Sequence, residues 1–342
     1  MSWPATVHSV PLPIDVDAAF VVVDTQLEQR AQETAGLIDW SEKREAMLGK
    51  TSEPNLLSDI KLPVLPQALI EFSQLADDPY CEIRKLAAIV ESDTGLTCQL
   101  LRAVNASVNG LRHKISSAHH AIATLGIRRA KLQLITVALQ NALPAKQLKL
   151  INLATFWNAN LERAIFAKHI ARLLKADEHL AFSAALLCDF LLPVLTNDRD
   201  ERYLEFLNPS STGSSNFCLF EDQTFGCNHA EAAARVMFDW GFPDDLICCV
   251  MQHHHGLAIL TDADLGQSAA AAVAVASLIP DPLRQSSGGM EQLQNLSNVW
   301  NAFDLEQFAE TVYEEYQPQA RDSANHISLR DHVRKLLEPA TV

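Results

Sequence analysis

The sequence predicts an all-α protein, and three observations lead to this fold class. Only 12 of the 342 residues are glycine. Long stretches rich in Ala, Leu and Ile place their apolar residues at helical spacing. No two segments show the alternating pattern that a β-hairpin requires. Because 48% of the residues are hydrophobic, the chain can bury a large core, which excludes wholesale disorder.

The charge balance narrows the range of partners. The chain has 27 Lys and Arg against 42 Asp and Glu, a formal net charge of -15. An acidic protein of this kind repels phosphate backbones, so we expect neither nucleic acid nor a membrane as a partner. No signal peptide and no run of about 18 apolar residues is visible. Seven cysteines without paired spacing favour a cytoplasmic location and argue against a zinc ribbon.

Helical periodicity and capping residues divide the chain into elements. Asp78 and Pro79 are typical of a helix start, and Gly126 is typical of a helix end. Pro193 interrupts a nearly all-apolar helix, and such a helix belongs in the centre of a protein. The expected helices cover about residues 79–92, 96–108, 118–125, 128–143, 154–170, 180–192, 230–240, 244–251 and parts of 305–337.

The remaining segments are polar or weakly patterned. Residues 18–40 form an amphipathic stretch, and the run EKREAMLGK that follows predicts a solvated helix face. Residues 208–216 predict a loop. The stretch RQSSGG, residues 284–289, predicts a linker to a C-terminal helical segment.

One carboxylate stands out because of its apolar surroundings. Asp189 lies inside AFSAALLCDFLLPVL, and burial of an unpaired charge costs several kcal/mol, so it needs a partner. The imidazoles of His229 and of His253, His254 and His255 are candidates. Asp with several neutral His is a ligand set for zinc, manganese or iron. Alternatively, Asp189 caps a helix end and one histidine is a hydrogen-bonded core group.

Other kinds of chemistry find little support in the sequence. No GxSxG motif and no activated cysteine indicates nucleophilic catalysis. No GxxxxGK[ST] or GxGxxG loop indicates a phosphate cradle. Arg128, Arg129 and Lys131 form a small basic group at a helix start, which we interpret as a solvated face. We therefore predict no catalytic residue.

Longer motifs resemble a known family. The run from LPVLPQALIEFSQL to KLQLITVAL, which begins at Leu62, closely resembles the first half of an HDOD domain, a relative of the HD metal-dependent phosphohydrolases. The second half is similar in Phe156-Trp157, AALLCDF, Glu221 with FGCNHAEAAARVMFDWGFPDDL, and the closing HH. The resemblance covers about residues 62–279. It implies a two-lobed helical domain of bacterial signalling proteins that is generally regarded as non-catalytic.

The resemblance also implies a division of the chain. We expect a helical N-terminal extension over residues 1–55 and the HDOD domain over 56–283. Its first lobe covers about 56–150 and its HD-like second lobe about 151–283. A helical C-terminal segment, 284–342, completes the chain.

Departures from the HD pattern concern the metal ligands. Ala159 stands where the pattern has a histidine, Cys188 replaces the histidine of the His-Asp doublet, and Ser277 stands near the position of the late aspartate. Asp189, His229, His253 and His254 occupy matching positions. The resemblance therefore implies a vestigial metal site at these four residues. We expect no cofactor, although Zn, Mn, Fe or Mg is the kind of ion such residues would bind.

Three functions remain open at this point. The first is a regulatory signal-transduction protein that binds regulatory or signalling proteins through a catalytically degenerate HD-type domain, docking on the first lobe or the C-terminal helices. The alternative is a metal-dependent phosphohydrolase or phosphodiesterase in which Cys188 is a soft ligand. The third is a sensor of a small ligand. The sequence does not indicate the oligomeric state.

Overall fold

The all-α class is confirmed. The computed structural model describes residues 38–49, 55–57, 60–107, 114–142, 148–207, 216–283, 285–286, 288–322 and 325–338. In these ranges every regular element is a helix, and none is a strand. The expected amphipathic stretch over 18–37 and most of the loop at 208–216 lie outside the described residues.

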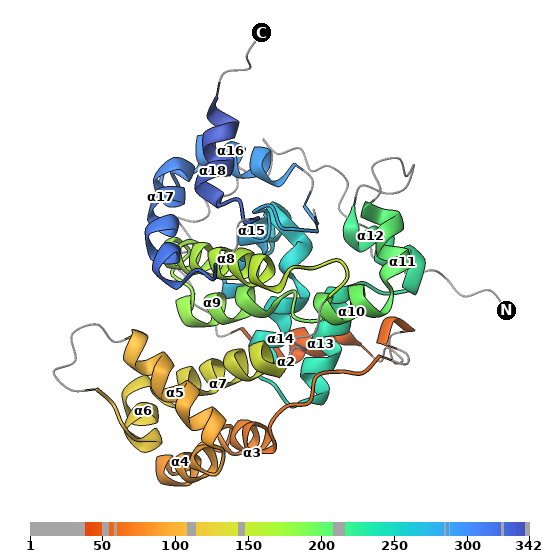
Figure 1. Cartoon of the computed structure of the whole chain (residues 1–342). Helices are drawn as coiled ribbons and strands as arrows, with labels where there is room; N and C mark the ends of the chain where they lie inside the picture. The colour runs from red at the N-terminus through yellow and green to blue at the C-terminus, as the bar shows by residue number, and fades with distance from the viewer. Residues whose placement is uncertain are drawn as a thin grey trace.

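The first lobe is a bundle of short helices at the bottom of Figure 1. It consists of α3 (Gln67–Leu75), α4 (Ile83–Glu91), α5 (Thr94–Ser107), α6 (Ala118–Leu125) and α7 (Ile127–Ala142). The predicted caps of α6 are present: the Ser117 hydroxyl accepts from His120 N, and Gly126 ends the helix with a φ of 81°. Apolar faces such as Leu86, Ala87 and Val90 of α4 are buried in the bundle.

One predicted helix start in this lobe is wrong. Asp78 and Pro79 form a turn, and α4 begins only at Ile83. The carboxylate of Asp78 accepts from Tyr80 N at 2.9 Å, which closes a local turn in place of a helix cap. Asp and Pro favour such turns as strongly as helix starts, so the dipeptide alone cannot distinguish them.

The second lobe contains the central helices of Figure 1. Its elements are α8 (Leu153–Leu173), α9 (Glu178–Leu187), α10 (Leu192–Asp198), α11 (Asp200–Leu207), α12 (Phe217–Phe225), α13 (His229–Asp239), α14 (Asp244–Met251), the 3-10 helix η2 (His253–Thr261) and α15 (Ala269–Ala276). Most of α8 is buried, including the charged Glu162 and Arg163.

The apolar helix predicted over 180–192 ends earlier than expected. α9 stops at Leu187, and Pro193 lies in the first turn of a new helix, α10. Proline fits there because the first turn needs no intrahelical N–H. The segment Glu178–Asp198 is the one described stretch with the length and apolarity to cross a membrane, but 83% of its most apolar window is buried inside the protein.

The extensions at both ends contact the second lobe. Helix α2 (Trp40–Leu48) packs on α14, where Arg44 forms an ion pair with Asp244; the 3-10 helix η1 (Asn55–Leu57) follows it. The C-terminal helices are α16 (Gly289–Val299), α17 (Leu305–Tyr316), the 3-10 helix η3 (Gln317–Gln319) and α18 (Leu329–Leu337). Glu162 of α8 accepts hydrogen bonds from Leu329 N and from His326, so this segment is attached to α8.

Candidate metal centre

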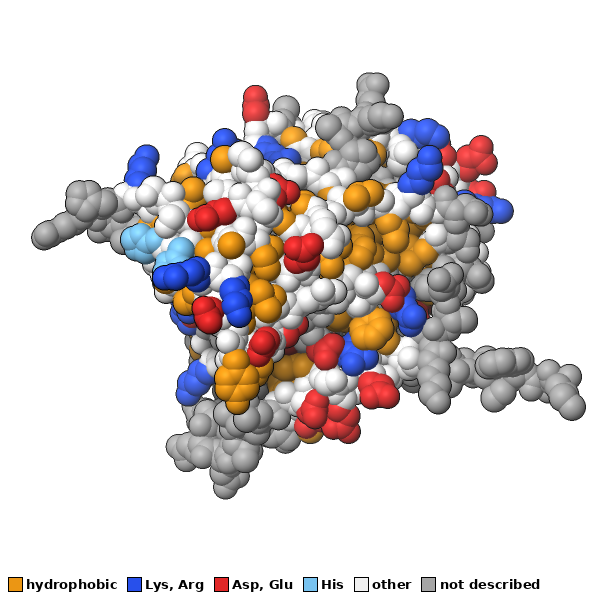
Figure 2. Space-filling view, turned by 90° about the horizontal axis from the view of Figure 1, so that it is seen from below, with side chains coloured by type: hydrophobic (Ala, Val, Ile, Leu, Met, Phe, Trp, Pro, Cys, Tyr) orange, Lys and Arg blue, Asp and Glu red, His pale blue; other side chains and the backbone are white. Residues whose placement is uncertain are grey.

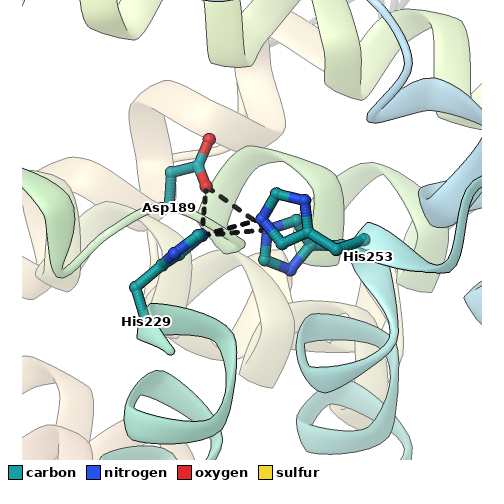
Figure 3. A group of neighbouring side chains, drawn as sticks. Asp189, His229 and His253 are labelled. Atoms are coloured by element: carbon teal, nitrogen blue, oxygen red, sulfur yellow. Dashed lines mark hydrogen bonds and ion pairs between the residues drawn. The ribbon is translucent and has the colours of Figure 1, made fainter. Parts of the chain in front are cut away.

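Asp189 lies in the turn between α9 and α10, where the early end of α9 leaves it in the core. Its backbone oxygen accepts from Leu192 N at 2.9 Å, and the residue is 1% exposed. The side chain points toward two histidines of neighbouring helices (Figure 3). The expectation that this buried carboxylate has partners is therefore confirmed.

His229 is held in one orientation by a carboxylate behind it. It is the first residue of α13, after the N-cap Asn228. Oε2 of Glu221 accepts from both the backbone N and Nδ1 of His229, at 2.9 and 2.6 Å. Oε1 of Glu221 accepts from the Tyr203 hydroxyl at 2.8 Å. These hydrogen bonds direct Nε2 of His229 toward Asp189, with 3.3 Å between Nε2 and Oδ1.

His253 and His254 come from the start of η2, directly after α14. Nδ1 of His253 donates to the carbonyl of Val250 at 2.6 Å. In the neutral ring this leaves the lone pair on Nε2, which lies 3.4 Å from Asp189 Oδ1. Nε2 of His254 lies 2.9 Å from Nε2 of His229.

The four residues predicted from the sequence thus meet. One ligand atom from each of Asp189, His229, His253 and His254 falls within 4.8 Å of the others. Oδ1 of Asp189 is buried and has no conventional hydrogen bond. Three imidazoles and one carboxylate are a donor set that fits a single Zn, Fe or Mn ion. Acceptors bind Nδ1 of two of these rings and thereby orient them.

A proton can stabilise the same cluster. Burial disfavours the imidazolium of His229, but Glu221 and Asp189 on its two sides raise its pKa to about 10. Burial lowers the pKa of His253, and burial together with the charges of its neighbours holds the pKa of His254 well below the usual value. The metal-free cluster at neutral pH therefore has one charged ring and two neutral rings, and a metal ion must displace that proton.

The second oxygen of Asp189 binds a group that the sequence did not indicate. Arg163, buried in α8, donates to Oδ2 and lies 3.0 Å from the sulfur of Cys188. Gln285 donates to the same Oδ2 at 3.1 Å. Although burial opposes ionisation, Arg163 and the hydrogen bond from His229 hold the pKa of Asp189 well below its ordinary value. A fixed guanidinium therefore supplies a positive charge beside the carboxylate.

The residues at the substituted HD positions do not add ligands to the cluster. Ala159 has no donor atom, and Ser277 donates its hydroxyl to the carbonyl of Val273 at 2.9 Å. Burial and the neighbouring Asp189 raise the pKa of Cys188 to about 12, so its thiol stays protonated. His255 is not part of the four-residue cluster. His119 and His120 are exposed, and His113 lies outside the described residues.

Asp281 is a further carboxylate near Asp189, and no motif in the sequence indicates it. Its oxygens accept from the Gln285 side chain at 3.2 Å and from the Gln285 backbone at 2.9 Å. Gln285 thereby bridges Asp281 and Asp189. Burial raises the pKa of Asp281, and Arg163 opposes that rise. Gln285 belongs to the polar stretch 284–289, which the sequence predicted as a linker. A stretch of that composition gives no sign of a buried contact.

Comparison with known proteins identifies the family. Residues 62–256 match the profile of the HDOD domain, which is more than half of the chain. The chain belongs to the HDOD family. An uncharacterized protein of Treponema pallidum is 22% identical to this HDOD protein over 197 residues, which are 57% of this chain and 38% of that relative. The chain therefore spans well under half the length of that relative.

Solved structures share the fold of this HDOD protein. A "putative phosphohydrolase" from Shewanella amazonensis aligns with a TM-score of 0.57 and 21% identity, over 78% of this chain and 98% of that one. A "putative signal transduction protein" from Marinobacter aquaeolei aligns with a TM-score of 0.52 and 18% identity, over 85% of this chain and 66% of that one. At these identities the likeness concerns the fold alone.

Proposed function

We propose that this HDOD protein is a regulatory signal-transduction protein of the bacterial cytoplasm that binds other proteins and catalyses no reaction. The contact of Arg163 with Asp189 carries the proposal. Metal-assisted hydrolysis needs a cation with an open coordination position and an oriented base. Here a guanidinium occupies one oxygen of the central carboxylate and also contacts Cys188. The guanidinium of Arg163 therefore already supplies, next to Asp189, a positive charge that a further metal ion would otherwise supply.

Burial of the cluster supports the same conclusion. Asp189, His229 and His253 are at most 1% exposed and only His254 of the cluster is partly exposed, so a phosphate ester in solution has no direct contact with the first three residues. Hydrogen bonds to Glu221 and Val250 hold two of the rings in place. Buried polar groups that are held by hydrogen bonds in this way favour one packing of a core. We infer that the cluster keeps the second lobe rigid so that surfaces elsewhere can bind.

The first lobe is the surface that we propose for docking. Figure 2 looks at the molecule from the side of α3, α4 and α6, and hydrophobic side chains gather there in several groups between charged ones. Val64 and Tyr80, which flank α3, are 87% and 92% exposed. Tyrosine is enriched at protein interfaces because it combines apolar area with a hydroxyl. We expect signalling proteins to bind around these two residues.

A hydrolysis assay tests the absence of turnover. The purified chain is loaded in turn with Zn, Mn, Fe(II) and Mg and given nucleoside triphosphates, cyclic dinucleotides and a nitrophenyl phosphodiester. We expect no product above that formed by the metal alone. Asp189→Asn, which preserves the shape of the side chain, is the control variant. Metal-dependent hydrolysis by the wild type that this variant lacks would overturn the proposal.

A second candidate function rests on the convergence of four ligand atoms within 4.8 Å. If a single ion binds there, the protein is a mononuclear metal-dependent phosphohydrolase with a substituted site. Asp189, His229, His253 and His254 would hold the ion, which when bound supplies a Lewis acid. Elemental analysis of protein purified without added metal separates the two functions: one equivalent of metal that His229→Ala loses favours the enzyme.

A further inference from the structure

A cavity between the two lobes lies apart from the histidine cluster. It has a volume of about 700 Å³ and is formed where α6 meets α7 in the first lobe and where α8 meets α9 in the second. Volumes of this size are typical of sites for small molecules. Leu125, Ile127 and Leu132 give it an apolar wall, and none of the four cluster residues lines it.

Two cations on this cavity lack a partner. Arg129 and Lys175 line it and are both exposed. Among the described residues, neither side chain forms an ion pair or a hydrogen bond. Lys175 also adopts a left-handed backbone conformation with a φ of 56°, which costs free energy in every residue except glycine.

The carboxylates of the cavity, by contrast, are neutralised within the protein. Asp177 forms an ion pair with Arg128 and caps α9 by accepting from two backbone N–H groups. Glu178 accepts two hydrogen bonds from Arg172. The unpaired charge that faces the cavity is therefore positive, in a chain with a net charge of -15.

Arg128 joins the two walls of the cavity. It extends from the first turn of α7 and pairs with Asp177 and with Asp245 of the second lobe. Directly beside it, the 16-residue helix α7 begins after Gly126, which has no side chain to cap it. The positive end of the helix dipole adds to the field of Arg129 at this wall.

We propose that this cavity binds a phosphorylated small molecule of nucleotide size. Its phosphates would contact Arg129 and Lys175, since guanidinium and ammonium groups are the usual phosphate partners in proteins. The apolar wall would contact the base or another ring. The cavity spans both lobes, so the bound molecule would strengthen the arrangement that Arg128 now holds. The proposal is independent of the proposed docking function, because it concerns other residues.

Calorimetric titration with two probes tests the proposal. ATP and inorganic pyrophosphate are titrated separately into the full chain in EDTA, which keeps metal ions out of the histidine cluster. We expect both to bind and to raise the melting temperature, with ATP the tighter of the two because only it contacts the apolar wall. Failure of both probes to bind at millimolar concentration would overturn the proposal.

Two substitutions locate the binding site. Lys175→Gly removes one cation and relieves the left-handed backbone, so this variant stays folded. Arg129→Ser removes the other cation, and Arg84→Ser removes another exposed arginine of the first lobe as a matched control. We expect Lys175→Gly and Arg129→Ser each to weaken the affinity for ATP roughly tenfold or more. The control variant should leave this affinity within about twofold of the wild type. Equal weakening by all three, or by none, would contradict the proposal.

Discussion

At the scale of single residues, Arg163 is the main difference between the expected site and the observed one. The sequence marked Asp189 as a carboxylate in need of partners and indicated His229 and His253, and both contact its Oδ1. It gave no reason to choose Arg163, because a single arginine in a long helix is ordinary. Only the packing of α8 against α9 brings it to Oδ2. Gln285 escaped notice for the same reason, and metal binding stays a prediction.

Removal of Arg163 should destabilise the protein strongly. Arg163→Met preserves much of the side-chain volume but leaves Asp189 with a buried charge, which costs about 3–5 kcal/mol in the free energy of unfolding. Lys131→Met is the matched control: Lys131 is also buried, but the side chain of its partner Asp77 is 65% exposed and stays hydrated. We expect a cost there of about 1 kcal/mol or less. Urea unfolding measures both, and equal costs would contradict this account.

At the scale of elements, the sequence predicted the helices themselves better than their ends. α6, α7, α13 and α14 lie within about two residues of expectation, because glycine and proline residues bound their apolar periodicity. α4 and α9 do not, because Asp78 closes a turn and Pro193 opens a helix. The end of α9 is the one that matters for the site, since it places Asp189 in a turn. Local propensity cannot reveal an end that tertiary packing decides.

The attachment of α18 to α8 is testable through Glu162. This buried carboxylate accepts from Leu329 N at 2.9 Å and from His326 Nε2 at 3.1 Å. Glu162→Ala leaves the buried N–H of Leu329 without its acceptor, a loss of about 1–3 kcal/mol. We expect amide hydrogen exchange in α18 to accelerate roughly tenfold or more, with little change in α13.

Glu310 provides the comparison for that experiment. It pairs with Arg330 and Arg334 of α18 through a side chain that is 45% exposed, so Glu310→Ala should change exchange in α18 by about twofold or less. If both variants accelerated exchange equally, the buried carboxylate would not be what holds α18.

At the scale of the whole molecule, the two lobes are joined by polar contacts as well as by the core. Arg128 of the first lobe pairs with Asp177 and Asp245 of the second, and Ser73 donates to the carbonyl of Gly241 at 3.2 Å. We interpreted Arg128, Arg129 and Lys131 as a solvated face, which is wrong for Lys131 because that residue is 3% exposed. The side chain of Arg128 is indeed 55% exposed, but its partners are more than 40 residues distant in sequence, and spacing along the chain carries no signal of them.

Arg128→Ala should lower the melting temperature at low salt, by an amount that corresponds to about 1–2 kcal/mol for two ion pairs. Because the side chain is half exposed, salt screens these pairs, and the difference from wild type should shrink at 0.5 M NaCl. Arg202→Ala is the control, since its exposed pair with Glu205 lies within α11; we expect less than about 0.5 kcal/mol. If the difference in melting temperature between Arg128→Ala and the wild type did not depend on salt, the ion pairs of Arg128 would not be what stabilises the contact between the lobes.

The double contact of Arg163 has a consequence for how such a protein can evolve. Its guanidinium touches both Cys188 and Asp189, so a substitution of Cys188 by histidine would force a ring against a buried cation. Substitution of Arg163 alone would leave the buried carboxylate of Asp189 without its cation. Each of these single substitutions is therefore expected to destabilise the second lobe, and only an exchange of both residues together would avoid that cost. The pair of contacts therefore limits which residues the fold can accept at positions 163 and 188.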